Sequence, residues 1–176
     1  MAEIGPSKQL ASLEFLGDAT QYATQLNSLI QRSSMFENFN LAEIRLLSQF
    51  MSAYRAEADV EVIREGDGGD FMMLLLEGNI GVFKRDRWNA QRLIAVLQPG
   101  HTVGEMSMID GEPRFATCVA EERCLVTVLT REALARIILE QPVLGAKILM
   151  ELVLMLSQRL RQTSQRLVSY MDREQT

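Results

Sequence analysis

The chain has few of the residues that disulfide frameworks, metal sites and haem sites require. Its 176 residues include two cysteines and one histidine. Cys118 and Cys124 are too few for a disulfide framework or an iron–sulfur ligand set, so we expect small core residues on adjacent strands, kept reduced. His101 follows Pro99-Gly100, which predicts an exposed turn residue and not a haem ligand. Since no catalytic nucleophile–base set or metal cluster is visible either, we expect neither enzymatic activity nor a metal site.

Basic charge and long apolar runs are also scarce. The chain has 18 Lys and Arg against 23 Asp and Glu, and its net charge of −5 argues against nucleic-acid binding by bulk electrostatics. The longest apolar run, Ile148–Leu156, is broken by Glu151 and is too short for a membrane span. The N-terminus lacks the basic and apolar blocks of a signal peptide. We therefore expect a cytoplasmic protein with no membrane contact, consisting of one domain with an appended long helix.

The most informative stretch is 103–117, Val-Gly-Glu-Met-Ser-Met-Ile-Asp-Gly-Glu-Pro-Arg-Phe-Ala-Thr. Gly104 permits a tight backbone path, and a helical turn starting at residue 105 would direct unpaired N–H groups toward an anion. Arg114 offers a planar fork of donors to phosphate oxygens, whereas the carboxylate of Glu105 accepts hydrogen bonds and suits a ribose hydroxyl. This pattern predicts a ligand with a phosphate beside a ribose, which is a cyclic nucleotide. The alternative is a surface Glu–Arg salt bridge beside a turn.

The same stretch resembles the phosphate-binding cassette of cyclic nucleotide-binding domains. The flanking segments 62–71, 76–83 and 97–105 also resemble this family, and the likeness covers about residues 29–172. It implies a jelly-roll barrel and ligand contacts from Gly104, Glu105, Met106, Ser107, Arg114, Phe115 and Ala116. Phe115 departs from the family, in which this position is usually Ala, Ser or Thr and touches the phosphate. Its N–H can still donate, but its ring must point away from the ligand or crowd it, and the N–H of Ser107 could compensate.

Apolar periodicity and turn residues predict an α+β chain. Short β-rich segments lie between turn formers from about residue 58 to 130, which indicates a sandwich or barrel; they begin at Val60, Phe71, Ile80, Arg92 and Cys124. An irregular helical pattern covers 8–31, and a helix is expected at 41–53, capped by Asn40 with Glu43. The acidic glycine turn at 65–70 lacks the spacing of a calcium loop. We expect an N-terminal helical extension (1–28), the barrel with its flanking helices (29–141) and a long helix (142–176).

The long helix is predicted to form a dimer. It starts at Pro142 and runs to about residue 172, with an a/d seam formed by Leu149, Val153, Leu156, Leu160, Thr163, Leu167 and Tyr170. Ile148, Leu152, Leu154 and Met155 widen the apolar stripe where the helix would also pack on the barrel. The polar residues outside the seam, Arg159 among them, are predicted to form a solvent-exposed face of the helix. The alternative is that the whole stripe packs on the chain's own barrel.

The run 159–167 also resembles the ligand-facing part of the dimer helix in catabolite activator proteins. That likeness implies that Thr163 and Ser164 contact the base of the ligand, one from each subunit. The chain stops at Thr176, too soon for the helix-turn-helix domain that follows this helix in transcription factors of the family.

These observations lead to one main hypothesis, a homodimeric cAMP sensor in a bacterial cytoplasm. It would signal through its long helix to an unknown downstream protein. Two alternatives remain: a sensor of cGMP or a cyclic dinucleotide, and a protein-interaction module with a degenerate pocket.

Overall fold

The structure is a computed structural model that describes residues 9–30 and 39–174. Two antiparallel sheets face each other. The larger sheet has the order β1 (Glu14–Asp18), β2 (Ser52–Ala56), β9 (Cys124–Thr130), β4 (Phe71–Glu77), β7 (Thr102–Val103). The smaller sheet has the order β3 (Glu61–Ile63), β8 (Thr117–Ala120), β5 (Ile80–Arg85), β6 (Gln91–Leu97). The predicted α+β jelly-roll architecture is confirmed.

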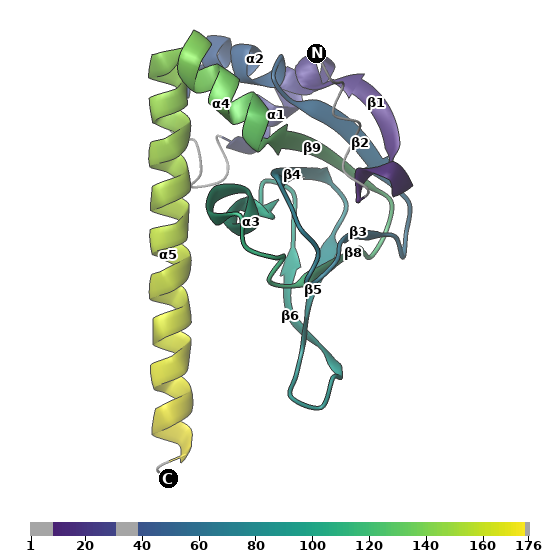
Figure 1. Ribbon diagram of the computed structural model, residues 1–176, viewed down its shortest axis with the longest axis vertical. Coiled ribbons are helices and arrows are strands. Elements are labelled where there is room, and N and C mark those ends of the chain that lie inside the picture. The colour runs from purple at the N-terminus through teal and green to yellow at the C-terminus, as the bar shows by residue number, and fades with distance from the viewer. Residues whose placement is uncertain (1–8, 31–38, 175–176) are drawn as a thin grey trace.

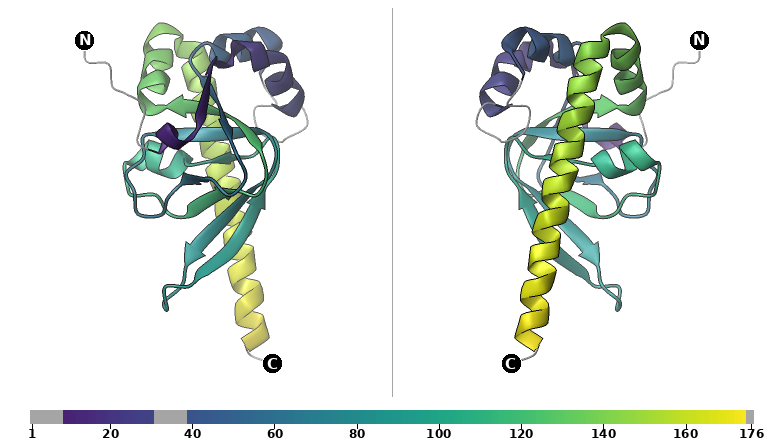
Figure 2. Two further views of the ribbon diagram at one scale, coloured as in Figure 1. Left: turned by 90° about the vertical axis from the view of Figure 1, so that its right-hand side faces the viewer. Right: turned by 90° about the vertical axis from the view of Figure 1, so that its left-hand side faces the viewer.

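Helices cover one end and one side of this sandwich (Figure 1). They are the 3₁₀ turns η1 (Leu10–Ser12) and η2 (Ala19–Tyr22) and the helices α1 (Ala23–Ile30), α2 (Leu41–Ser48), α3 (Glu105–Asp110), α4 (Arg131–Glu140) and α5 (Pro142–Glu174). Helices α1, α2 and α4 gather at one end, and α5 runs beside the sandwich and projects past it. The β5–β6 hairpin projects in the same direction as α5 (Figure 2).

Strand β4 shows why the sheet has apolar residues on both faces. Six of its seven residues are buried, because side chains alternate between two separate cores. Met72, Leu74 and Leu76 pack against the helices, while Phe71, Met73 and Leu75 fill the space between the sheets. The larger sheet is therefore sandwiched between a helical layer and the smaller sheet.

The N-terminal extension predicted as helical (residues 1–28) is only partly so. Residues 1–8 lie outside the described chain, and β1 occupies the middle of the segment, pairing antiparallel with β2. Gly17 adopts φ +101°, a left-handed conformation that no helix accepts and that ends the apparent helical period. Phe15 lies 5.4 Å from Tyr54 of β2, ring centroid to centroid. The segment thus joins the larger sheet, and α1 spans the boundary expected after residue 28.

Helix α2 begins where the sequence predicts but ends sooner. The side chain of Asn40 accepts from the N–H of Glu43, and the carboxylate of Glu43 accepts from the N–H of Asn40, which confirms the capping box. The helix ends at Ser48 and not at residue 53, because Ser52 already pairs with Val128 in the sheet.

Helix α5 carries two separate apolar stripes. Ile148, Leu152 and Met155 are buried against the sandwich as predicted, whereas Leu154 is 46% exposed, so its predicted packing on the barrel is wrong. Leu156 is partly buried against the core, but most of the seam does not pack on the chain's own barrel. Its large exposed side chains are Leu149, Val153, Leu160, Leu167 and Tyr170. At its start the helix presses on α4, where a Cβ on Gly145 would lie 2.8 Å from the Cα of Ile138.

The two cysteines are free and buried, on the successive strands β8 and β9 of different sheets. His101 is exposed, as expected, with Nδ1 2.9 Å from the carbonyl oxygen of Gln98. In the part of the chain that the structure describes, no helix is long and apolar enough to span a bilayer. The same residues contain no group of three or more His, Cys, Asp or Glu that could hold a metal ion.

The burial of both thiols predicts slow alkylation. Burial raises the pKa of Cys118 to about 12 and raises that of Cys124 as well, so little thiolate is present at neutral pH. We expect the native protein to resist a thiol-specific reagent and the unfolded protein to react at both cysteines. Rapid labelling of the native chain would contradict the burial of these strands.

Candidate functional site

The site is built around α3, which starts where the sequence predicts a helical turn. Gly104 is its N-cap, with φ +85°, a conformation that L side chains rarely adopt. A Cβ at this position would also lie 2.7 Å from Nη1 of Arg114. The first N–H groups of α3 have no intrahelical partner and lie at the start of the helix, next to Gly104. Glycine is thus required here for both the backbone conformation and the approach of the arginine.

Arg114 is almost completely buried, and only one of its three guanidinium nitrogens is hydrogen-bonded. Its Nη1 donates to the carbonyl oxygens of Phe71 (2.9 Å) and Gly104 (2.8 Å), and the guanidinium lies 4.3 Å from the centroid of the Phe71 ring. Nε and Nη2 have no partner among the described residues. Burial lowers the pKa of this group from its ordinary value. Nε and Nη2 form an edge of the guanidinium, and such an edge can bind a carboxylate or phosphate through two parallel hydrogen bonds.

The loop before β4 fixes the position of Arg114. The backbone N–H of Arg114 donates to the carbonyl of Asp67 (2.8 Å), and the N–H of Gly66 donates to the carbonyl of Arg114 (2.9 Å). A Cβ built on Gly69 would overlap the guanidinium itself. The sequence showed a tight surface turn in this loop but gave no sign that it covers Arg114.

Glu105 is buried and paired with a residue that the sequence reasoning missed. Its Oε1 accepts from Nη1 of Arg159 on α5, and Nη2 of Arg159 donates to the carbonyl of Thr102 at 2.7 Å. Arg159 is therefore not part of a purely solvated face. Oε2 of Glu105 has no partner among the described residues. Burial raises the pKa of this carboxyl, and the nearby Arg159 opposes that rise.

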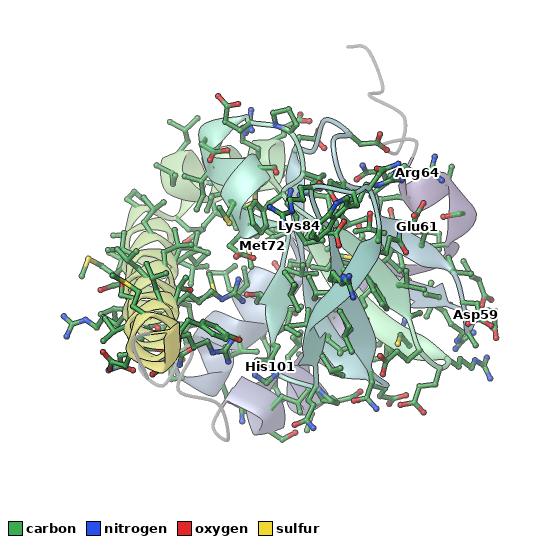
Figure 3. All side chains as sticks on the ribbon, turned by 90° about the horizontal axis from the view of Figure 1, so that it is seen from below. Asp59, Glu61, Arg64, Met72, Lys84 and His101 are labelled. Atoms are coloured by element: carbon green, nitrogen blue, oxygen red, sulfur yellow. The ribbon has the colours of Figure 1, made fainter. Side chains whose placement is uncertain are left out.

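Phe115 extends away from the core and contacts β5. The residue is 54% exposed, and Nζ of Lys84 lies 4.3 Å from the centroid of its ring. The same ammonium donates to the carbonyl of Phe115 and to Oε1 of Glu65, both at 2.7 Å. Lys84 is labelled in Figure 3, which views the molecule from the end where the hairpin and α5 project. Lys84 thereby links the cassette to the β5–β6 hairpin.

The remaining predicted residues lie around this centre. Ser107 and Ala116 are buried, and Met106 is 47% exposed. Thr163 and Ser164 are exposed on α5, where the hydroxyl of Thr163 donates to the carbonyl of Arg159 (2.8 Å). Thr163 therefore lies one turn, about 6 Å, beyond the residue that contacts Glu105. That spacing of four, on the same face of the helix, was the signal that could have identified Arg159.

Helix α3 is also held at its other end, by Arg131 at the start of α4. The guanidinium of Arg131 donates to the carbonyl oxygens of Met108 (2.6 Å) and Ser107 (2.7 Å). These carbonyls lie in the last turn of α3, where a cation is favourable. Since Arg159 contacts the first residue of α3, two arginines from α4 and α5 hold the cassette helix at its two ends.

The unpaired polar atoms define what the site can bind chemically. A buried cationic fork needs an acceptor with two oxygens, and a buried carboxylate oxygen needs a hydroxyl or N–H donor. Leaving such groups unpaired is costly in a native protein, so a ligand that pairs them binds favourably. The arrangement therefore suits an anion that carries a hydroxyl next to its charge.

A family model described as the cyclic nucleotide-binding domain matches residues 54–141, half of the chain. The chain belongs to the cyclic nucleotide-binding domain family. It is similar to the crystal structure of a cyclic nucleotide-binding domain from Methylobacillus flagellatus KT, with 35% identity and a TM-score of 0.82. That likeness covers 91% of this chain and 90% of the other.

The curated relatives are regulatory proteins. The chain is 26% identical, over 65% of its length, to a cAMP-dependent protein kinase regulatory subunit of Eremothecium gossypii. It is 22% identical, over 81% of its length, to a CRP-like cAMP-activated global transcriptional regulator of Mycobacterium tuberculosis. The chain spans 24% of the first relative and 62% of the second, so the likeness concerns one domain of longer proteins.

The ion pair between Arg159 and Glu105 yields a stability prediction. Arg159→Gln leaves a buried carboxylate without its cation, and we expect the free energy of unfolding to fall by about 1–3 kcal/mol. Glu105→Gln in the same chain should recover part of the loss, because it removes the buried carboxylate that residue 159 no longer neutralises. Chemical denaturation of both single variants and the double variant measures this coupling.

Arg161→Gln, an exposed change two residues further along α5, serves as the control and should leave stability unchanged. Additive effects of the two substitutions would show that the pair contributes nothing.

Proposed function

We propose that this domain binds cAMP as a homodimeric sensor and signals through α5. The single observation that carries the proposal is the pair of unsatisfied buried groups, the guanidinium edge of Arg114 and Oε2 of Glu105. In the proposed complex, Nε and Nη2 of Arg114 donate to the phosphate, together with N–H groups of α3 and of Phe115 and Ala116. Oε2 of Glu105 accepts from the ribose 2′-hydroxyl. The names of the two curated relatives, both cAMP-regulated, support this choice of ligand.

The proposed dimer uses the exposed seam of α5. A monomer would leave Leu160 and Leu167 in water at 68% and 59% exposure, in a heptad pattern that favours a second helix. Thr163 lies within this seam and Ser164 beside it. Pairing two helices would therefore bring the hydroxyls of both subunits close to the base of the ligand.

Signalling would follow from the contacts of α3. The ligand binds to Glu105, which already holds Arg159 on α5, so ligand and helix share one carboxylate. A ligand shifts a conformational equilibrium only through different affinities for its states. Here those affinities differ because the position of α5 sets how Glu105 is oriented and neutralised. A downstream protein would read the position or pairing of α5.

The first test is calorimetric titration of the whole chain with cAMP, with cGMP and a cyclic dinucleotide as competitors. We expect cAMP to bind and Arg114→Ala to abolish binding. Arg114→Lys should weaken it about 100-fold or more, since a point charge replaces a fork. Arg64→Ala is the matched control, because this exposed arginine pairs with Glu61 and should not affect affinity.

Absence of heat with every nucleotide, together with a melting temperature that no nucleotide raises, would reject ligand sensing and favour the interaction module with a degenerate pocket. Tighter binding of cGMP or a cyclic dinucleotide would keep the sensor and change its ligand. Retained affinity in Arg114→Ala would refute the role given to this residue.

The second test concerns the dimer. Sedimentation velocity should show a dimer for the unaltered chain and a monomer for Leu160→Glu with Leu167→Glu, because four buried charges in one seam oppose pairing. Arg161→Glu, on another face of the same helix, should remain dimeric. A monomeric unaltered chain at the highest attainable concentration would contradict the proposal.

A further inference from the structure

The β5–β6 hairpin carries exposed apolar and basic residues that the ligand site does not use. Register places Leu93 opposite Phe83 and Val96 opposite Gly81, on the outer face of the smaller sheet. Leu93 is 54% exposed and Val96 45%. The inner face belongs to the cassette, since Lys84 contacts Phe115 there. The outer face has no such role.

The tip of the hairpin presents the chain's only tryptophan on a rigid turn. Oδ1 of Asp86 accepts from the N–H groups of Trp88 (2.9 Å) and Ala90 (3.0 Å), and its Oδ2 accepts from Nε of Arg92 (2.9 Å). Trp88 is nevertheless 69% exposed, with the guanidinium carbon of Arg87 3.9 Å from its ring centroid. A large aromatic side chain that is exposed on a pre-organised turn loses little entropy on binding, as in the anchors of protein interfaces.

Strand β6 is an edge that could accept another strand. It is last in the order β3-β8-β5-β6, so one side of its backbone has no partner strand among the described residues. Its seven residues contain no proline or lysine, and six of them are exposed. Proline and lysine are among the residues that normally keep an edge strand from pairing with another chain. The pairing of β6 with β5 is irregular only at Ile94, where the register shifts. Its unpaired N–H and C=O groups suit a polypeptide and would not be satisfied by lipid.

Charge indicates the kind of polypeptide. Residues 84–93 contain four basic residues and one acidic residue. Lys84 pairs with Glu65 and Arg92 with Asp86, which leaves the positive charges of Arg85 and Arg87. Arg85 and Arg87 are exposed at the tip, so a partner that lies along β6 meets positive charge at one end and aliphatic side chains further on. An acidic segment with aliphatic residues at alternate positions complements both features.

We propose that the outer face of the β5–β6 hairpin docks an extended, acidic segment of a partner protein, which adds as a strand to β6 and covers Trp88. The docking needs no cyclic nucleotide, so it stands or fails separately from the proposed ligand. The partner is defined by chemistry alone: alternate aliphatic residues, carboxylates and free backbone N–H groups.

The test uses Trp88 as its own reporter, because no other tryptophan contributes to the emission. The whole chain is titrated with a synthetic peptide of alternating Glu and Val that matches the seven residues of β6. We expect a saturable blue shift with half-saturation at or below about 1 mM, and slower hydrogen exchange of β6 amides. A Lys–Val peptide, and a Glu–Val peptide with alternate prolines that cannot donate, should bind at least about tenfold more weakly.

Variants separate the contributions. Arg85→Gln with Arg87→Gln should weaken peptide binding at least about tenfold, whereas Arg123→Gln, an exposed arginine outside the hairpin, should not change it. In Trp88→Ala, the Glu–Val peptide should protect the β6 amides from hydrogen exchange less than it does in the unaltered chain.

Any of three results would overturn the proposal. The first is no shift with the acidic peptide, and the second is equal binding of the Lys–Val or proline peptides. The third is a shift with vesicles of phosphatidylcholine and phosphatidylserine but not with peptide, which would mark a lipid-facing tip instead.

Discussion

The burial of one guanidinium, that of Arg114, constrains the rest of the structure. A buried cation is stable only where backbone carbonyls or anions surround it. Here α3 provides the carbonyl of Gly104 and β4 provides that of Phe71, while the loop at Gly69 leaves room for the group. Two segments distant in sequence, 69–71 and 104–114, must therefore meet at one point. Gly69 and Gly104 are required because a Cβ at either position would clash with the guanidinium of Arg114, and not because these loops must be flexible. Nε and Nη2, which remain unpaired, are the atoms that the proposed ligand would use.

Helix α3 turns this local constraint into a property of the whole domain. It is six residues long and has little stability of its own. Its start contacts Arg159 and its end contacts Arg131, and these arginines belong to α5 and α4, which touch closely at Gly145. Any displacement of α3 thus acts on a connected pair of helices. A short helix held by two longer ones is a suitable place for a small ligand to produce a large movement.

The sequence predicted the parts of the site that depend on local rules and missed those that depend on tertiary contacts. Gly104, the start of α3, the Asn40–Glu43 capping box and the start of α5 at Pro142 follow from backbone conformation and capping, and all four are confirmed. Arg159 was predicted to be solvated because its spacing from Thr163 shows only that the two share a helix face, and not that a carboxylate lies across from it. Strand β1 was missed because its pairing with β2 decides its conformation, and Leu154 because a wide apolar stripe does not show which edge meets the barrel.

The β5–β6 hairpin connects the two proposals through its two faces. On the inner face Lys84 holds the carbonyl and ring of Phe115, the residue whose N–H is proposed to meet the phosphate. On the outer face lie Leu93, Val96 and the turn with Trp88. A partner strand on β6 would restrict the hairpin, and with it the position of Lys84. Since coupling between sites is reciprocal, a nucleotide that alters the affinity for the partner must have its own affinity altered equally. The unusual phenylalanine after Arg114 then gains a physical role, because a smaller side chain would leave the ammonium of Lys84 without its aromatic contact.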